Sequence, residues 1–356
     1  MKDPAEKKTT SRSTGWRTLL AEDGALPAAL ARCGADHSQL KPVTDVFPMR
    51  INTYFRSLIQ TADDPLGRQV IPAPAELEDA AAPLDPLDEE HQSPTPCVIH
   101  RYPRRVVFLV SNQCAVYCRF CMRKRRTAGG RQVPAALLAE GMQYIARRTD
   151  IDEVILSGGD PLMLPDNRLL HILEALRRIP HIRVLRIHTR MPGVLPQRIT
   201  RRLARALARF QPLYVNIHFN HPDELTPASE EACRRLADAG IALGSQTVLL
   251  RGVNDDPAVL ARLMMRLLSI RVRPYYLHQL DHVRGTAHFR VPLEHARELA
   301  ASLRGRVSGM AVPHFAVDLP GGGGKVALLP DAVIEEGDAC WWIRNWQGRR
   351  YAYPMR

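Results

Sequence analysis

The stretch VVFLVSNQCAVYCRFC, residues 106–121, joins a β-branched apolar run to three closely spaced cysteines. Val106 to Val110 is predicted as a strand, and Cys114, Cys118 and Cys121 follow it on one loop with C-x3-C-x2-C spacing. Three thiolates on one loop can each bind one iron of a cubane and leave the fourth iron open to a small molecule. A structural zinc site would need a fourth protein ligand. The stretch therefore predicts a chemically active iron–sulfur centre.

This strand is the first of six β-rich runs that alternate with amphipathic helical patterns. The other five are expected at Val154–Leu156, Val184–His188, Tyr214–Phe219, Leu243–Leu250 and Tyr275–Gln279. Between the second and third runs, apolar residues recur with a helical period after Asp166, which we expect to cap that helix. This alternation is typical of parallel βα units. We predict an α/β fold, an open six-unit (βα)6 partial TIM barrel whose functional loops gather at the carboxyl ends of the strands.

The regions that flank the barrel differ from it in composition. Residues 1–98 are predicted to form a helical extension and linker, with helical patterns around Leu19–Ala31 and Arg50–Ile59. A stretch rich in proline, alanine and acidic residues follows, and its prolines oppose a continuous helix. We expect the barrel at residues 99–290 and a C-terminal segment at residues 291–356.

The composition is that of a globular protein, with 356 residues of which 45% are hydrophobic. Met1 to Arg12 are polar and lack the apolar run of a signal peptide, and no later run is long enough to span a bilayer. We therefore expect a soluble cytoplasmic protein with no membrane partner. The seven cysteines should be reduced there, so clustered cysteines are interpreted as ligands.

Two stretches with glycines offer further cofactor sites. Ser157-Gly158-Gly159-Asp160 follows the second predicted strand, where glycines let the backbone approach a ligand closely. Near the end of the chain, Asp318 to Lys325 contains four consecutive glycines before the lysine. The spacing differs from that of a phosphate-binding loop, and Val326 replaces the hydroxyl residue. A lysine presented in this way could form a Schiff base with an aldehyde cofactor, or could lie in a solvated surface loop.

Together these motifs closely resemble the lysine 2,3-aminomutase family of radical S-adenosylmethionine enzymes, including shorter relatives that supply β-lysine for modifying elongation factor P. The resemblance covers the chain from about Val46 to Pro354. The matching stretches are His100–Pro103, Cys114–Arg123, Ser157–Asp160, His218–Pro222, Leu249–Asp255, Arg273–Tyr276 and Pro320–Lys325. The resemblance implies that the protein is an isomerase that transfers an amino group within its substrate.

The resemblance also implies three cofactors. Cys114, Cys118 and Cys121 hold a [4Fe–4S] cluster, and its open iron chelates S-adenosyl-L-methionine. Residues expected near that second cofactor are Ser157, Gly158, Gly159, Asp160 and His218, although His218 is equally well explained as a core histidine. Lys325 is expected to be the catalytic lysine that binds pyridoxal 5′-phosphate. Residues expected around this third cofactor are Arg101, Tyr102, Arg105 and Gln246, and guanidinium forks suit its phosphate.

The implied substrate is L-lysine. Arg123 is placed to bind its carboxylate, while Asp281 and Asp318 match the family's pair for its far ammonium group. A buried ammonium needs opposite charge nearby, whereas relatives that act on glutamate would need neutral or positive groups there. Structural ion pairs are the alternative role for both aspartates.

The implied reaction begins when a reductant such as flavodoxin or ferredoxin delivers an electron to the cluster. A 5′-deoxyadenosyl radical takes hydrogen from the β-carbon of lysine, nitrogen migrates from the α- to the β-carbon, and adenosylmethionine is regenerated. The longer aminomutases bind structural zinc through a cysteine-rich tail and a cysteine that matches Asp256 here. This chain has neither, so we predict no zinc and leave a homo-oligomer open.

Alternative functions use the same motifs differently. The reaction could be dedicated to β-lysylation of elongation factor P. A radical RNA-modifying enzyme is suggested by the net charge of +12 and the run Arg123-Lys124-Arg125-Arg126. Without a recognisable nucleic-acid module, we interpret that run as charge in and near the active site. A non-catalytic iron–sulfur protein would leave the lysine loop unexplained.

Overall fold

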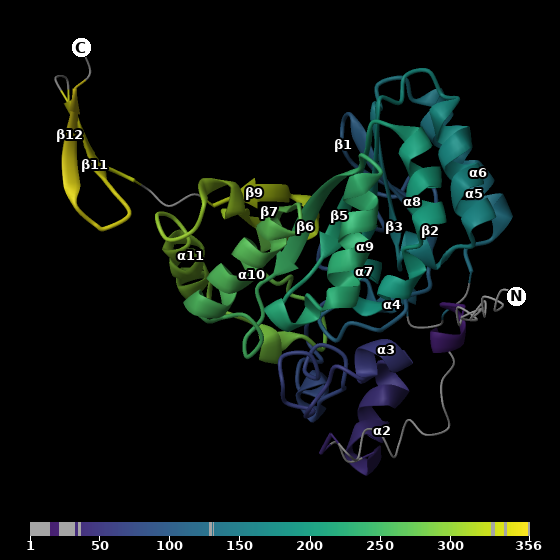
Figure 1. Ribbon diagram of the computed structural model, residues 1–356, viewed down its shortest axis with the longest axis horizontal. Helices are drawn as coiled ribbons and strands as arrows, with labels where there is room; N and C mark the ends of the chain where they lie inside the picture. Colours follow the sequence, from purple (N-terminus) through teal and green to yellow (C-terminus); the bar gives the residue numbers. More distant parts are fainter. Residues whose placement is uncertain are drawn as a thin grey trace, which may run out of the picture.

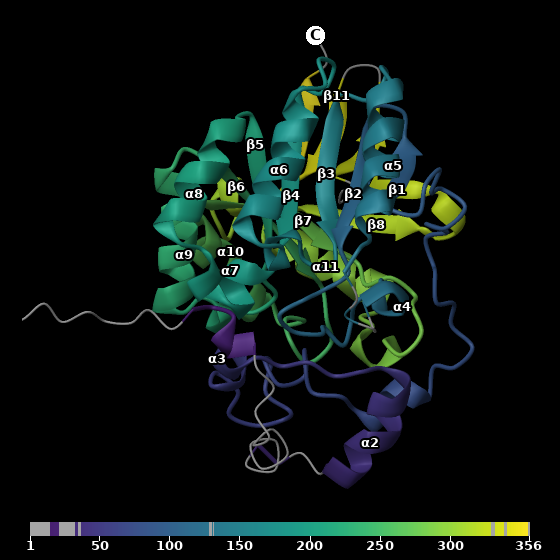
Figure 2. The ribbon, with the colours of Figure 1, turned by 90° about the vertical axis from the view of Figure 1, so that its right-hand side faces the viewer.

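The computed structural model describes residues 15–20, 33–34, 37–127, 130, 132–328, 332–337 and 340–354. These residues form a nine-stranded sheet of order β1 to β9 and a separate three-stranded sheet of order β10 to β12. The large sheet is curved, helices cover its outer face, and the N-terminal helices α2 and α3 lie across one end (Figures 1 and 2).

Seven neighbouring strands of the large sheet, β2 to β8, run parallel, while the outermost strands β1 and β9 run antiparallel to their neighbours. The strands are β1 Val98–Tyr102, β2 Arg105–Ser111, β3 Glu153–Gly158, β4 Val184–Thr189, β5 Leu213–His218, β6 Ala242–Val248, β7 Val272–His278, β8 His314–Leu319 and β9 Gly324–Ala327. The sheet order runs from β1 at one edge to β9 at the other, so the barrel is open.

Amphipathic helices bury one face against this sheet. These helices are α5 Ala135–Arg147, α6 Asp166–Arg177, α8 Arg201–Leu207, α9 Pro227–Asp238, α10 Pro257–Ser269 and α11 Leu293–Ser302. In α6, the residues Leu169, Ile172, Leu173 and Leu176 share a face and are buried, as a helical period requires. The remaining helices are α2 His37–Val46, α3 Thr53–Arg56, α4 Lys124–Thr127 and α7 Met191–Val194. No helix in the described ranges is both long and apolar enough to cross a membrane.

The predicted α/β partial barrel is confirmed, and its six predicted strands correspond to β2 through β7. The strand pattern missed β8, which adds a seventh parallel strand. This strand pairs with β7 at only three positions and follows a long connection, so its local sequence carries a weak signal. The predicted cap of α6 is wrong, because Pro165 holds the cap position and Asp166 begins the helix. The Asp166 carboxylate instead pairs with Arg198 at 2.7 Å.

Helices in the N-terminal extension also differ from the prediction. Only Thr53–Arg56 of the expected Arg50–Ile59 helix is helical, and its N-cap is Asn52. Most of the expected helix at Leu19–Ala31 lies outside the described residues, and its start belongs to a 3₁₀ turn at Thr18–Leu20. The helix α2 was not predicted.

The C-terminal part of the chain divides between the two sheets. Its strands β8 and β9 extend the large sheet and form a hairpin at its edge. Three later strands, β10 Val333–Glu336, β11 Cys340–Arg344 and β12 Arg350–Pro354, form the small sheet that projects from the body in Figure 1. The hairpin and α11 therefore belong to the main body, whereas the small sheet does not extend the large one.

Candidate active site

A cavity of about 370 Å³ opens among residues at and beyond the carboxyl ends of the parallel strands. Ligand sites of barrel folds occur at this end of the sheet. All the residues predicted to hold the cluster, a cofactor or the substrate line this one cavity: Arg101, Tyr102, Arg105, Cys114, Cys118, Cys121, Arg123, Ser157, Gly158, Gly159, Asp160, His218, Gln246, Asp281, Asp318 and Lys325. Residues up to 224 positions apart in the sequence thus face one space.

The cysteine loop leaves β2 and is held by backbone contacts with the N-terminal extension. The Tyr117 N–H donates to the Arg50 carbonyl, and the Arg119 N–H donates to the Gln69 carbonyl, both at 2.9 Å. The Arg119 side chain is buried and pairs with Glu76 at 2.7 Å. The extension therefore satisfies the polar groups of a loop that would otherwise lack partners.

The three cysteines fit an iron–sulfur cluster in residue type and placement. Burial and the neighbouring thiols raise the pKa of Cys114 well above its usual value, and burial and Cys118 raise that of Cys121 to about 11. A bound metal centre would favour the thiolates instead. Within the described residues, no three potential ligands converge tightly enough for a single ion. A four-iron cube would spread its three cysteine ligands over a larger volume.

The glycine pair after β3 is required by its close approach to the cysteine loop. Gly158 has a φ of 125°, and a Cβ there would lie 2.1 Å from the Ser111 carbonyl oxygen. A Cβ on Gly159 would lie 2.5 Å from the Gln113 carbonyl oxygen. Larger residues would displace the loop that carries the cysteines, so the pair shapes this wall of the cavity whatever ligand it contacts.

Asp160, next in the chain, uses its carboxylate to join β3 to β4. Its oxygens accept hydrogen bonds from the Thr189 hydroxyl at 2.8 and 2.9 Å, from the Arg190 N–H at 2.8 Å and from the Leu162 N–H at 2.9 Å. These contacts give Asp160 a structural role in the cavity wall.

The lysine end of the cavity is built by the hairpin of β8 and β9, which places Lys325 opposite Asp318. Glycines before Lys325 adopt positive φ angles, 61° at Gly321 and 81° at Gly322, that suit the tight turn. The Lys325 N–H donates to the Tyr102 hydroxyl at 2.8 Å. The Lys325 ammonium donates to Asp318 and, at 3.1 Å, to His278 Nδ1. The side chain therefore points into the cavity.

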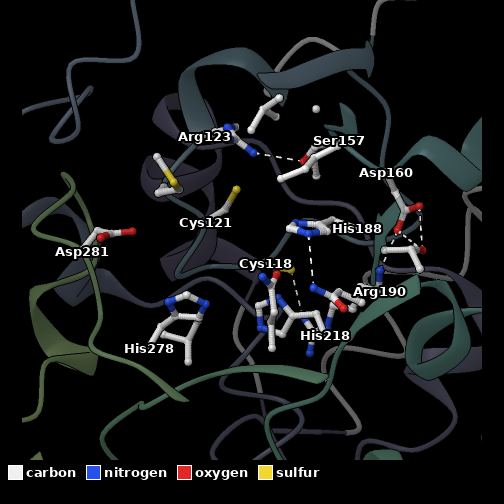
Figure 3. A pocket seen from close by; sticks show the side chains of 18 of the residues that line it. Cys118, Cys121, Arg123, Ser157, Asp160, His188, Arg190, His218, His278 and Asp281 are labelled. Carbon is white, nitrogen blue, oxygen red and sulfur yellow. Dashed lines mark hydrogen bonds between the residues drawn. The ribbon is translucent and has the colours of Figure 1, made fainter. Parts of the chain in front are cut away.

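Three partly buried histidines line the cavity from strands β4, β5 and β7: His188, His218 and His278 (Figure 3). Burial lowers the pKa of each, and nearby cations add to the effect. For His218, burial and Arg190 lower the pKa to about 4. All three are therefore neutral near pH 7. A neutral His278 can accept a hydrogen bond from Lys325.

Basic side chains surround the lysine end. The Arg105 guanidinium lies 4.1 Å from the centre of the Tyr102 ring. Among the described residues, no carboxylate forms an ion pair with Arg105, whereas Arg101 lies 3.7 Å from Asp318. Arg105 is thus available to an anionic group, which fits the phosphate of pyridoxal 5′-phosphate.

The charged residues predicted to bind substrate have different surroundings. Arg123 forms an ion pair with Glu89. It also donates to the Ser157 hydroxyl at 3.2 Å (Figure 3). Asp318 is bound by Lys325. In the part of the chain that the structure describes, the Asp281 carboxyl group has no hydrogen-bond or ion-pair partner. Burial and Asp318 raise its pKa to about 7.

Sequence reasoning missed several residues of this cavity. Arg190, after β4, donates to the Cys118 sulfur at 2.8 Å and pairs with Glu224 at 3.1 Å. Glu89 reaches Arg123 from the acidic segment before β1, and His278 reaches Lys325 from the end of β7. The position of His278 near the carboxyl end of a predicted strand was a usable signal, but Glu89 is one of several acidic residues in an irregular stretch, which gave no signal.

Comparisons with known proteins agree with this geometry. The chain matches the family models for the radical SAM superfamily over residues 108–264 and lysine-2,3-aminomutase over residues 300–355. L-lysine 2,3-aminomutases from Fusobacterium nucleatum and Clostridium subterminale are each 46% identical to it. These alignments cover 84% and 86% of this chain, and 72% and 75% of those proteins. Glutamate 2,3-aminomutase from Clostridioides difficile is 42% identical, over 87% of this chain and 74% of that protein.

Both aminomutase names denote isomerases, and the radical SAM superfamily implies a [4Fe–4S] cluster and S-adenosylmethionine. The similarity to the relatives extends over most of both chains. The two family models include the cysteine loop and the lysine hairpin, respectively, and both of these line one cavity. The chain belongs to the lysine 2,3-aminomutase family of radical S-adenosylmethionine enzymes.

Proposed function

We propose that this protein converts L-lysine to β-lysine and uses pyridoxal 5′-phosphate bound by Lys325. One observation supports lysine as the substrate. The Asp281 carboxyl group, which has no partner among the described residues, lines the same cavity as the guanidinium group of Arg123. An α-amino acid with a distant ammonium group matches these two charges. The relatives named as lysine aminomutases support the same substrate.

The residues proposed to bind the cluster and those proposed to bind pyridoxal 5′-phosphate lie at two different ends of the cavity. Cys114, Cys118 and Cys121 would hold the cluster, and Lys325 with Arg105 would hold pyridoxal 5′-phosphate. When bound, these groups and adenosylmethionine supply a carbon-centred radical and an aldehyde that can hold the substrate's amine. The chain itself positions the reactants and keeps Lys325 oriented through Asp318 and His278.

Discrimination between lysine and glutamate follows from charge. Arg123 would bind the carboxylate that both amino acids share. The second carboxylate of glutamate would meet Asp281, with Asp318 and Glu89 nearby, and like charges repel strongly in a partly buried site. Asp318 is engaged by Lys325 in this structure, so Asp281 is the more available of the two aspartates for an ammonium group.

The basic run that suggested an RNA-modifying enzyme is largely neutralised within the protein. Arg123 pairs with Glu89, and the buried Lys124 pairs with Glu76 at 3.1 Å. Arg125 pairs with three acidic residues, Asp85, Glu89 and Glu90. These contacts support the interpretation of the run as internal charge beside the active site.

Lysine binding is expected to strengthen as the pH rises through about 7, because Asp281 then loses its proton and becomes a carboxylate. Below that pH, the neutral carboxyl group cannot balance an ammonium. The KM for lysine should therefore fall between about pH 6 and about pH 8. Initial rates of the native enzyme and of Asp281→Asn over this range measure the effect. The variant should have a raised KM without this fall, and an equal fall in both proteins would exclude Asp281 as its cause.

Substrate choice can be measured directly with anaerobically reconstituted enzyme. An equimolar mixture of L-lysine and L-glutamate is incubated with adenosylmethionine and dithionite, and the β-amino acids are separated by mass spectrometry. We expect β-lysine to exceed β-glutamate by at least about 100-fold, because one mismatched buried charge costs several kcal/mol. A preference for glutamate would contradict the proposed substrate while leaving the family assignment intact.

A further inference from the structure

The acidic segment at residues 85–92 links the two ends of the candidate active site. On the cysteine side, Arg125 in α4 pairs with Asp85 at 2.8 Å. On the lysine side, the Gly321 N–H donates to the Pro86 carbonyl at 3.1 Å. These two contacts hold the start of the segment, and its other end is held by the Gln92 carbonyl, which accepts a hydrogen bond from the His100 N–H at 2.8 Å. The backbone from which Glu89 projects is therefore fixed on both sides.

Glu89 projects from this segment onto Arg123 and is almost completely buried, with 3% of its side chain exposed. Arg123 Nε donates to both Glu89 oxygens at 3.1 and 3.0 Å, and Nη2 donates to Oε1 at 2.6 Å. Burial alone would raise the pKa of Glu89, but Arg123, Arg125 and Arg126 outweigh burial and lower it. Glu89 is therefore a carboxylate that fixes the guanidinium plane.

The hydrogen bonds of Arg123 leave one side of its guanidinium group free for a ligand. A guanidinium group has five N–H donors in a rigid plane. Glu89 occupies Nε–H and one donor of Nη2, while the Ser157 hydroxyl accepts from Nη1. One N–H then remains on each of Nη1 and Nη2. Glu89 lies along the Nε–Nη2 edge of the guanidinium group, so another carboxylate can approach the Nη1–Nη2 edge without displacing Glu89.

We propose that Glu89 is a positioning residue that directs the free end of the Arg123 guanidinium at the carboxylate of the amino-acid substrate. The proposal rests on the proposed function, because it takes Arg123 as the carboxylate-binding residue. Glu89 itself does not touch the substrate. It holds the plane of Arg123 so that the substrate is anchored in one orientation relative to the cluster and Lys325.

Two other roles for Glu89 make different predictions. If Glu89 competed with the substrate for Arg123, its removal would tighten the binding of lysine. If Glu89 only stabilised the fold, its removal would weaken all ligands equally. A positioning role acts solely through the substrate's carboxylate, so its loss should affect only ligands that carry this group.

The test compares the binding of L-lysine with that of 1,5-diaminopentane, which is lysine without its carboxylate. Equilibrium dialysis is performed anaerobically on the reconstituted holoenzyme. The native protein should bind lysine more tightly than the diamine. In Glu89→Gln, the ratio of the dissociation constant of the diamine to that of lysine should fall about tenfold or more. The matched control is Glu90→Gln, because the neighbouring Glu90 side chain is 65% exposed and contacts Arg125 instead. This control should keep the native ratio.

Iron content and cofactor absorption confirm that each variant is folded and loaded. If Glu89→Gln does not load, Glu89→Asp keeps the charge but shortens the reach, and it should also narrow the ratio. An unchanged ratio, tighter lysine binding, or equal weakening of both ligands would overturn the positioning role. A native protein without any preference for lysine over the diamine would instead overturn the proposed substrate, and the role of Glu89 with it.

Discussion

The variant Cys118→Ala is expected to lose the iron–sulfur cluster and with it all detectable turnover. Cys118 shares one loop with Cys114 and Cys121, and its sulfur accepts a hydrogen bond from the buried Arg190. Two thiolates cannot hold three irons of a cubane, and without the cluster no radical is generated. Iron analysis should show about four irons per chain in the reconstituted native protein and less than about one in the variant.

The control for this experiment is the set of four other cysteines, Cys33, Cys97, Cys233 and Cys340. Cys233 is fully buried in α9, so Cys233→Ala also removes a buried thiol but lies outside the cysteine loop. All four alanine variants should keep the native iron content. A Cys118→Ala protein with a complete cluster, or the loss of iron from a control variant that remains folded, would show that the ligands are assigned wrongly.

The variant Lys325→Ala should lose the covalent link to pyridoxal 5′-phosphate but keep the cluster. Lys325 projects from the β8–β9 hairpin, whereas the cysteines follow β2 at the other side of the cavity. Its amine is the one that contacts Asp318 and His278, and alanine offers no nucleophile there. Turnover should fall by more than about 1,000-fold, while iron content should stay unchanged.

Borohydride reduction followed by peptide mapping locates the link in the native protein. The cofactor mass should appear on the peptide that contains Lys325 and should be absent from the variant. The matched control is Lys41→Ala, because Lys41 is exposed and pairs only with Asp45 in the described structure. A reducible link that persists in Lys325→Ala would identify another lysine as the true partner.

Short motifs of the sequence predicted the residues around which the cavity is built. The cysteine loop and the glycines before Lys325 are contiguous runs, and their chemistry is set by residue type and spacing. The alternating strands similarly predicted β2 to β7, because each strand has its own apolar pattern. Such features can be recognised in the sequence without knowledge of tertiary contacts.

Partners that depend on tertiary structure were not predictable in this way. Glu89 lies 34 positions from Arg123 in an irregular acidic segment, and only the folded chain brings them together. Arg190 reaches Cys118 from the position just after β4, across 72 positions of the sequence. The glycines Gly158 and Gly159 were expected from ligand contact, yet their closest neighbours are backbone atoms of the cysteine loop. These contacts depend on which strands are neighbours in the sheet, and this order cannot be predicted from the local sequence.

The most direct test of the account is whether hydrogen from lysine passes through adenosylmethionine in the same enzyme that binds pyridoxal 5′-phosphate at Lys325. Reconstituted enzyme is incubated with L-lysine deuterated at its β-carbon, adenosylmethionine and dithionite. The β-lysine formed and the recovered adenosylmethionine are then analysed by mass spectrometry. The account predicts β-lysine with deuterium at its α-carbon and deuterium in the recovered adenosylmethionine. β-Lysine formed without any deuterium in adenosylmethionine, or no β-lysine from fully loaded enzyme, would contradict it.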